Sequence, residues 1–431
     1  MLNTSFFAKK PRFEYETGGS TPAESESIPM PDRATFFLKK PLDGKTAISI
    51  KIGDRVKTGQ KICPFPETDI YAISSVTGTI SSITQYTGDY GQVYTAVSVI
   101  TEDKDDFDDG FAAAIDAEGI EAAKAYLGAI PGVPATDIFS STDSPIDTIV
   151  ICGVEKDLLM ATNQFVLKTN VAFMNAGISA LKKITGVHKV VIALPQSLMA
   201  DAGGVGGASG VELRVIDTAY PAALPRMIMK NIIGKPVPAD KTCEDLGVSF
   251  VTAEAVVSIG RAVQERKLPV TKTFTLINKD MSKRMVSARI GTPMSDIFKA
   301  FDITLLEKDR VVVGGPMTGA AIYAEDHPVC PDTDALMIQD SKDIPMVADT
   351  PCINCGECVR ICPADIPVNM LVRFLEARQY EDAADMYDLY SCVECGLCSF
   401  VCVSKIPIFQ YIRLAKYELD RIRKEEEAAN V

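Results

Sequence analysis

The chain has 431 residues and a mass of 46.5 kDa, and 47% of its residues are hydrophobic, which predicts about two to four domains with packed cores. Its formal net charge of −13 excludes a basic nucleic-acid-binding surface, and no apolar run approaches the ~20 residues of a membrane-spanning helix. We therefore expect any membrane contact to be made through partner subunits. The two histidines, His188 and His327, lie far apart in the sequence, which leaves little room for haem ligation.

The first third of the chain predicts an arm followed by a β domain. Residues 1–33 include ETGGSTPAESESIPMPD and too few apolar residues for a core, so we expect an extended or disordered arm. Residues 34–105 alternate Val, Ile and Thr with turn signals, which predicts short β-strands. This pattern resembles the barrel-sandwich hammerhead of biotinyl and lipoyl domains. Those carriers hold a modifiable lysine where this chain has Ser74-Ser75-Val76, so we predict a structural module.

An α/β domain is predicted for residues 111–265, after an acidic linker. SPIDTIVICGV, HKVVIALP and VELRVIDT read as strands, and the stretch 158–184 between the first two has helical periodicity, which together indicate a largely parallel sheet. Ligands of such sheets bind beyond the carboxyl ends of the strands, here at Gly153–Asp157 and at the loop 202–210. Because that glycine-rich loop precedes a strand, whereas a phosphate loop opens a helix, we interpret it as an ordinary loop.

Two further domains are predicted in the second half of the chain. Residues 268–325 contain a predicted hairpin, a short helix and the strand RVVVGGPMTGAAI, which indicates a small β module. Residues 345–420 carry two helical stretches, VNMLVRFLEARQYEDAADMYDLY and IPIFQYIRLAKYELDRIRKEEE.

Eight cysteines in this last region form two copies of Cys-x-x-Cys-x-x-Cys-x-x-x-Cys. A 4Fe–4S cluster takes four thiolates, and in ferredoxin-type pairs the fourth comes from the last cysteine of the other motif. The first predicted cluster is therefore ligated by Cys352, Cys355, Cys358 and Cys402. The second is ligated by Cys392, Cys395, Cys398 and Cys362.

Alternative interpretations of these cysteines explain less. Structural zinc would use two Cys-x-x-Cys pairs and leaves the remaining cysteines of each run without a role. Disulfides would require an oxidising compartment and an export signal, and MLNTSFFAKKPRFEY lacks the apolar core of such a signal. One difference between the copies is Val403, where the first has Pro363; it affects no ligand and at most shifts a potential. The scattered cysteines, Cys63, Cys152, Cys243 and Cys330, are expected to be buried apolar residues.

From about residue 36 the chain resembles the RnfC family of the Rnf-type electron transport complex. The resemblance lies in IKIGDRVKTGQKI, YPAALPRMI, RIGTPMSDIF, GGPMTG and the doubled cysteine motif ending in CVSKIPIFQYIRLAK. It implies a multi-domain α/β fold with four parts. These are a barrel-sandwich hammerhead, an α/β domain like the NADH-oxidising flavoprotein of respiratory complex I, a soluble-ligand-binding (SLBB-like) β-grasp domain and an α-helical dicluster ferredoxin domain.

Members of this family pass electrons between NADH, flavin mononucleotide (FMN) and two 4Fe–4S clusters on the cytoplasmic face of a membrane ion pump. This chain departs from their Gly-Leu-Gly-Gly-Ala-Gly-Phe-Pro-Thr flavin loop, with YLGAIPGVPATDIF at Tyr126–Phe139. Of the family's Glu-Cys-Glu-Pro-Tyr element it retains at best Glu155, after Gly153. Proline and bulky residues in the loop remove backbone donors and close approach, so we expect the FMN and NADH site to be lost. Survival of the pocket in altered form is the alternative.

Two functions follow from this resemblance. The favoured function is an electron-transfer subunit without a catalytic residue of its own, with a ferredoxin, a flavoprotein or a cytochrome as electron partner beside the other subunits of a membrane-bound complex. The alternative is an FMN-containing subunit that oxidises or produces NADH, or reduces cobalamin. A non-redox assembly scaffold is a weaker interpretation, because all eight ligands are intact. A cytoplasmic, peripheral location on the inner face of the cell membrane is implied.

Overall fold

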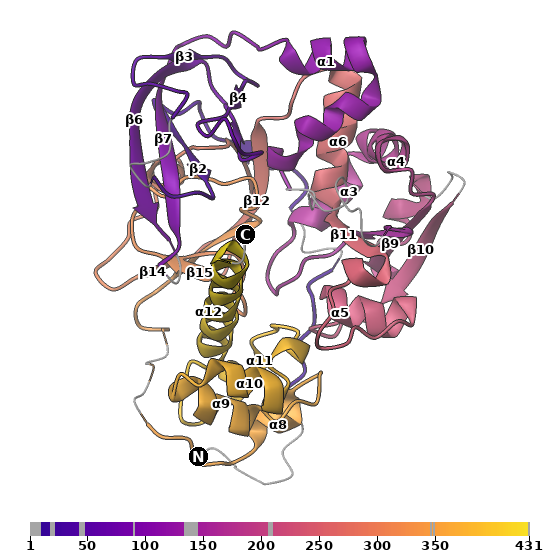
Figure 1. Ribbon diagram of the computed structural model, residues 1–431, viewed down its shortest axis with the longest axis vertical. Coiled ribbons are helices and arrows are strands. Elements are labelled where there is room, and N and C mark those ends of the chain that lie inside the picture. Colours follow the sequence, from indigo (N-terminus) through magenta and orange to yellow (C-terminus); the bar gives the residue numbers. More distant parts are fainter. Residues whose placement is uncertain are drawn as a thin grey trace.

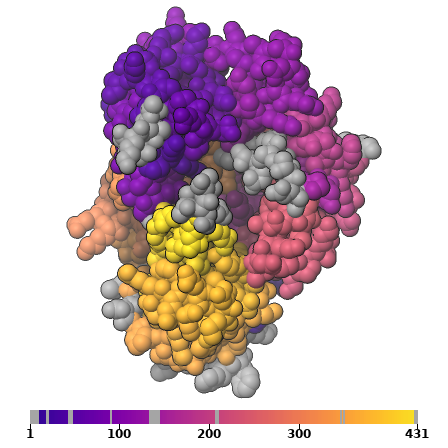
Figure 2. All heavy atoms as spheres, viewed as in Figure 1, coloured from indigo at the N-terminus to yellow at the C-terminus, as the bar shows by residue number. Residues whose placement is uncertain are grey.

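The computed structural model describes residues 10–17, 22–42, 48–88, 91–132, 145–205, 210–344, 347 and 350–429. A mainly β half and an α/β half lie side by side, and the helical cysteine-bearing region lies below them (Figure 1). This region forms the lower end of the face shown in Figure 2. None of the helices in the described part of the chain combines the length and apolar character that a bilayer span requires.

The β half begins with the predicted barrel of short strands. Its strands are β2 (Arg33–Leu38), β3 (Arg55–Val56), β6 (Gly78–Thr87) and β7 (Val93–Thr101) in the antiparallel order β2-β7-β6-β3, with β4 (Lys61–Ile62) paired to β5 (Ala72–Ile73). Ala34, Phe36 and Leu38 are all buried, because alternate residues of β2 face the core. Ser75, in the turn that corresponds to the carrier lysine, is buried and donates its hydroxyl to the carbonyl of Ile290, which agrees with a structural module.

The α/β half is built on one parallel sheet of order β10-β9-β8-β11. Its strands are β8 (Thr148–Cys152), β9 (Lys189–Pro195), β10 (Val211–Ile216) and β11 (Val248–Thr252). Its helices are α1 (Gly110–Glu118), α3 (Thr162–Thr169), α4 (Val171–Thr185), α5 (Pro225–Ile228) and α6 (Ala253–Glu265), with short turns η2 (Ile120–Ala125), η3 (Leu127–Ala129), η4 (Gln196–Leu198), η5 (Asp201–Gly204), η6 (Met229–Ile233) and η7 (Glu244–Leu246). Helices α4 and α6 pack backbone to backbone, since a Cβ at Gly177 would overlap the carbonyl of Val256. The parallel sheet predicted for this region is confirmed, and β11 adds a strand that was not anticipated.

The two faces of this sheet contact different parts of the molecule. Ile149 and Ile151 point into the core beneath α4 and α6, whereas Val150 and Cys152 belong to a second core on the other face. This alternation follows from the two-residue period of a strand. The second core includes Cys395 and Leu397 of the second cysteine motif, so the sheet carries that motif on its outer face.

A six-stranded sheet completes the β half and is larger than the module expected at 268–325. It contains β12 (Thr271–Ile277), β13 (Lys283–Arg289), β14 (Arg310–Val313) and β15 (Ala320–Ile322), with α7 (Met294–Ala300) following the hairpin. Two segments outside the expected limits also join it, in the order β1-β13-β12-β16-β14-β15: β1 (Ser25–Ser27) and β16 (Ala335–Gln339). Strand β16 separates the hairpin from β14, and β1 pairs with the otherwise open edge of β13.

The N-terminal segment is extended as expected, but its described residues are ordered against the fold. Tyr15 is buried, its amide donates to the carbonyl of Thr218 at 2.8 Å, and its ring lies edge-on to Tyr220 at 5.5 Å. Phe13 contacts Phe400 at 4.8 Å between ring centroids. Two aromatic anchors thus compensate for the scarcity of other apolar residues in the described part of this arm.

The cysteine-bearing region is helical, as predicted. It consists of α8 (Glu357–Ile361), α9 (Val368–Glu376), α10 (Tyr380–Tyr387), η8 (Leu389–Ser391), α11 (Leu397–Val401) and α12 (Ile408–Ala429). The amphipathic helix α9 buries Val368, Leu371, Val372 and Leu375 at the spacing of one helical face. Helix α12 runs from this region toward the middle of the molecule (Figure 1).

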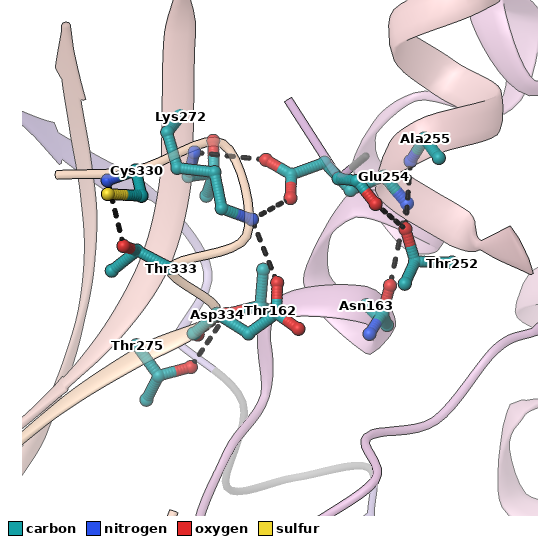
Figure 3. Close-up of polar contacts among 12 residues, drawn as sticks. Thr162, Asn163, Thr252, Glu254, Ala255, Lys272, Thr275, Cys330, Thr333 and Asp334 are labelled. Atoms are coloured by element: carbon teal, nitrogen blue, oxygen red, sulfur yellow. Dashed lines mark hydrogen bonds and ion pairs between the residues drawn. The ribbon is translucent and has the colours of Figure 1, made fainter. Parts of the chain in front are cut away.

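A fully buried lysine joins the two halves. Lys272 of β12 pairs with Glu254 in the first turn of α6 and with Asp334, which precedes β16, at 2.9 Å (Figure 3). Burial by itself lowers the pKa of Lys272, but Asp334 and Glu254 raise it above its ordinary value, so the lysine stays charged. Thr162 of α3 adds a hydrogen bond to the carbonyl of Asp334 at 2.7 Å. The α/β domain is therefore fastened to the six-stranded sheet through a buried charge network.

We predict that Lys272→Ala lowers the free energy of unfolding by about 3–5 kcal/mol, because it leaves two buried carboxylates without their cation. Lys342→Ala is the matched control, since the side chain of Lys342 is 74% exposed and pairs with Asp340 at the surface, where a pair contributes at most about 1 kcal/mol. Urea midpoints of the two variants measure the difference. Equal midpoints would show that the buried network adds nothing to stability.

Candidate iron–sulfur site

The two cysteine motifs fold as structural repeats. Each has a short helix, α8 or α11, opened by a glycine with positive φ: Gly356 at 75° and Gly396 at 72°. After the last cysteine of each motif, Asp365 and Lys405 occupy the same left-handed conformation, with φ of 56° and 55°. The backbone therefore turns in the same way twice, and each motif wraps its first three cysteines around one point.

The structure brings the last cysteine of each motif to the other motif. One pocket is lined by Cys352, Cys355, Cys358 and Cys402. A second pocket is lined by Cys362, Cys392, Cys395 and Cys398. These are the two sets that the ferredoxin-type pairing predicts. Each quartet surrounds a pocket. Among the described residues, no three His, Cys, Asp or Glu side chains are grouped closely enough to ligate a single ion.

The other residues that line the two pockets suit an iron–sulfur cluster. Aliphatic side chains such as Ile406, Ile408, Ile366 and Ile412 surround the sulfurs and exclude water. The amide of Glu394 donates to the sulfur of Cys392 at 3.4 Å, the kind of contact that tunes a cluster potential. The residues present therefore fit two 4Fe–4S clusters.

Burial governs the ionisation of the pocket thiols. It raises the pKa of Cys358 to about 11 and the pKa of Cys395 to about 12. Both are neutral thiols near pH 7 by themselves, and a bound cluster would hold them as thiolates, with release of their protons.

Tyr220 attaches the second motif to the α/β domain. Tyr220 is the first residue of the YPAALPRMI element, and its hydroxyl donates a hydrogen bond to the carbonyl of Cys395 at 2.7 Å. Val393 and Leu397 of the motif pack into the same core as Val150 and Cys152 of β8. The second pocket therefore lies directly against the sheet.

The GGPMTG loop supplies a second attachment. Buried Asp157, just beyond β8, accepts hydrogen bonds from the amide and hydroxyl of Thr318, each at 2.7 Å, and from the amide of Met317 at 3.2 Å. Burial raises the pKa of Asp157, although these donors lower it. The carbonyl of Met317 in turn lies so close to Gly396 that a Cβ there would overlap it. Asp157 thus orders the loop that contacts the second motif.

The predicted remnant of a flavin site occupies the point where the strand order of the parallel sheet reverses. Gly153 and Glu155 follow β8, the strand between β9 and β11. A Cβ at Gly153 would lie 3.2 Å from the carbonyl of Ala193, so the backbone there is already closely packed.

The carboxylate of Glu155 lies at the N-terminus of α3, where the free backbone amides of a helix can bind an anion. This carboxylate is buried and accepts hydrogen bonds from the amides of Asn163 and Gln164, at 2.5 and 3.2 Å, and from the side-chain amide of Gln164 at 2.7 Å. Burial raises the pKa of Glu155 to about 7, although these donors lower it. The helix N-terminus that could face a phosphate therefore already binds a carboxylate of the protein.

The described part of the altered flavin loop is likewise engaged within the protein. Ile130 is fully buried in the core. The amide of Gly128 donates to the hydroxyl of Tyr71 at 2.9 Å, and the amide of Gly132 donates to the carbonyl of Pro331 at 2.9 Å. Residues 133–139 of this loop, and 206–209 of the glycine-rich loop, lie outside the described residues.

The other cysteines do not gather with the two quartets as pocket-lining residues. Cys152 and Cys243 are buried, as expected, whereas Cys63 and Cys330 are half-buried. Burial raises the pKa of Cys152 to about 11, so it behaves as an apolar thiol.

Comparisons with known proteins agree with this architecture. Residues 14–105 match the RnfC barrel sandwich hybrid domain, and residues 351–407 match the 4Fe-4S dicluster domain. The C component of the ion-translocating oxidoreductase complex of Pectobacterium carotovorum is 26% identical over 100% of this chain and 61% of its own length. The C component of the proton-translocating ferredoxin:NAD(+) oxidoreductase complex of Clostridium ljungdahlii is 26% identical over 91% of this chain and 89% of its own length.

The chain thus spans about three fifths of the Pectobacterium protein. Among solved structures, an NAD+-reducing [NiFe]-hydrogenase in the H2-reduced state aligns with 75% of this chain and 69% of its own, at 15% identity and a TM-score of 0.47.

The two motif glycines offer a matched test of the contact with Met317. Alanine at either position meets the same left-handed backbone, which costs about 1 kcal/mol, but only at Gly396 does it also collide with Met317. We expect Gly396→Ala to speed hydrogen exchange in residues 314–319, whereas Gly356→Ala leaves that loop protected, because a Cβ at Gly356 meets no atom of the described residues within 4 Å. Equal exchange in both variants would contradict the attachment of the loop to the second motif.

Proposed function

Because this chain belongs to the RnfC family, we propose that it is an electron-transfer subunit that relays single electrons through two 4Fe–4S clusters within an ion-translocating oxidoreductase complex. The observation that carries this proposal is the pair of sulfur-lined pockets in one helical domain. The 4Fe–4S dicluster domain matched at residues 351–407 supports it.

The ligands follow from the residues that line each pocket. Cys352, Cys355, Cys358 and Cys402 hold the first cluster. Cys392, Cys395, Cys398 and Cys362 hold the second. When bound, each cluster supplies one-electron redox chemistry. The chain fixes the sulfurs, excludes water with its isoleucines and places the amide of Glu394 against a sulfur, where it favours the more negative, reduced state.

We infer further that the 111–265 domain is related to the flavoprotein of complex I and has lost FMN and NADH. Glu155 fills the anion position at α3, and Ile130 lies in the core where a phosphate loop would need open backbone amides. The six-stranded sheet, from 268 through β16, corresponds to an SLBB-like β-grasp domain. The second candidate is an FMN-containing subunit that reacts with NADH or cobalamin, supported by the parallel sheet with a reversal of strand order beside the second pocket.

Partners and location follow from the family. Other subunits of a membrane-bound complex would hold the chain at the inner face of the cell membrane, and a ferredoxin, flavoprotein or cytochrome would exchange electrons with it.

The proposal is tested by measuring flavin and iron in the anaerobically purified protein. Denaturation should release about eight irons per chain, the content of two 4Fe–4S clusters, and no flavin fluorescence. About one FMN with the same iron would establish the second candidate instead. Much less iron, in protein purified and reconstituted without oxygen, would contradict the relay itself.

The crossed ligation makes its own prediction for single cysteine variants. Cys352→Ala and Cys402→Ala should both lose the first cluster and leave the same electron paramagnetic resonance (EPR) spectrum, that of the second. Cys362→Ala should leave the other spectrum, because Cys362 lines the second pocket. If Cys352→Ala and Cys362→Ala instead leave the same spectrum, each motif holds its own cluster and the crossed assignment is wrong.

A further inference from the structure

The repeat in the cysteine domain extends beyond the cysteines into the helix that follows each motif. Cys392 corresponds to Cys352, and the start of α12 corresponds to the start of α9, because the same number of residues separates motif and helix in both copies. Counterpart residues of the two helices line the two pockets: Asn369 and Val372 the first, Phe409 and Ile412 the second. A difference between counterpart residues is therefore a difference between the surroundings of the two pockets.

The second motif carries an ion pair beside one of its cysteines. Lys416 of α12 donates to the carboxylate of Glu394 at 2.7 Å and to the carbonyl of Cys392 at 3.2 Å. The amide of Glu394 in turn donates to the sulfur of Cys392 at 3.4 Å. The side chain of Lys416 is only 17% exposed, so solvent ions screen its charge poorly. A largely buried cation is therefore held against the backbone of a predicted cluster ligand.

The matching positions of the first motif carry no cation. Asn354 stands in place of Glu394 and accepts a hydrogen bond from the side-chain amide of Asn369 at 2.8 Å. Glu376, the exposed last residue of α9, stands in place of Lys416. Neither pocket has a charged residue in the described part of its lining. The ion pair is thus a charge asymmetry between two otherwise similar sites.

Such an asymmetry acts on the reduction potential, because a reduced cluster carries one more negative charge than an oxidised cluster. Burial opposes the uptake of that charge. Cys395 and Cys398 of the second quartet are both buried, whereas Cys358 is the one buried cysteine of the first quartet. The positive charge of Lys416 offsets part of the cost of burial at the second pocket, and the negative charge of Glu394 limits this offset.

We propose that Lys416 is a positioning residue that holds a positive charge beside the second cluster and raises its reduction potential, with Glu394 as the opposing charge. The inference rests on the proposed function, because it takes the second pocket to hold a 4Fe–4S cluster. At that pocket the chain takes up one electron from a reductant, which is oxidised; no bond forms or breaks.

Anchoring α12 to the motif is the ordinary role of an ion pair in this position, and the two roles predict different results. If the pair only anchors the helix, loss of either partner disturbs the site in the same way. If its charges set the potential, loss of Lys416 and loss of Glu394 shift the potential in opposite directions.

A redox titration of the iron-loaded full chain with dithionite, followed by EPR, measures both potentials in one sample, with the first cluster as an internal reference. The spectrum that Cys352→Ala leaves identifies the second cluster, since Cys352 lines the first pocket. We expect Lys416→Met to weaken electron binding at the second cluster about tenfold relative to the first, a downward shift of about 59 mV for a one-electron couple. Glu394→Gln should shift the same potential upward, because it leaves Lys416 unopposed.

Two further variants control for the loss of packing. Lys416→Arg keeps the positive charge and should restore the potential of the unchanged chain. Arg421→Met removes a cation from the same helix, where Arg421 pairs with Glu418 and Glu425 at 2.7 Å but is 48% exposed. It should leave both potentials unchanged, because solvent screens a charge at the surface.

Shifts of the same sign in Lys416→Met and Glu394→Gln, or no shift in either, would overturn the inference, as would a loss of iron from both. If one of these variants loses iron, the direction of the shift in the other decides. An equal shift in Arg421→Met would also overturn it. Normal iron content with unmoved potentials contradicts this inference alone, whereas an unchanged chain that binds no iron contradicts the relay on which it rests.

Discussion

The cysteine domain depends on one constraint: the last cysteine of each motif must reach the first three of the other. Cys402 meets this constraint at the first pocket and Cys362 at the second. Because each motif gives its last cysteine to the other, both motifs follow the same backbone path. The left-handed residues Gly356 and Gly396 therefore recur at the same position of each motif. Neither pocket can be completed by one motif alone, so the domain folds around both as a unit.

The rest of the fold makes the two repeats inequivalent. Tyr220 and the Asp157-ordered loop hold the second motif against the α/β sheet, and the buried Lys272 network joins that sheet to the β half. The first motif presents Ile353 and Val403 outward. The two pockets are therefore inequivalent: the second lies against the sheet, and the first lies beside exposed side chains.

Local patterns carried most of the predictions: those of short strands and helices are confirmed, and the crossed ligation of two clusters stays a prediction. Cysteine spacing, strand alternation in the barrel and helical periodicity after Pro367 each depend on residues close in sequence. Contacts between distant residues left no such signal: Asp157 with Thr318, Tyr220 with Cys395 and Lys272 with Asp334 are ordinary residue types whose roles arise from tertiary packing. Strand β16 was missed because ALMIQ is a short apolar run without alternation, and β1 because SES has no apolar residue at all.

The central claim is that this chain stores and passes electrons only through its two clusters. Anaerobic titration of the iron-loaded chain with dithionite, followed by visible absorption and EPR, counts the electrons directly. We predict uptake of about two electrons per chain, one for each cluster, and no reduction by NADH. Uptake of about four electrons with bleaching of a flavin band, or reduction by NADH, would contradict it and return the nucleotide site to the α/β domain.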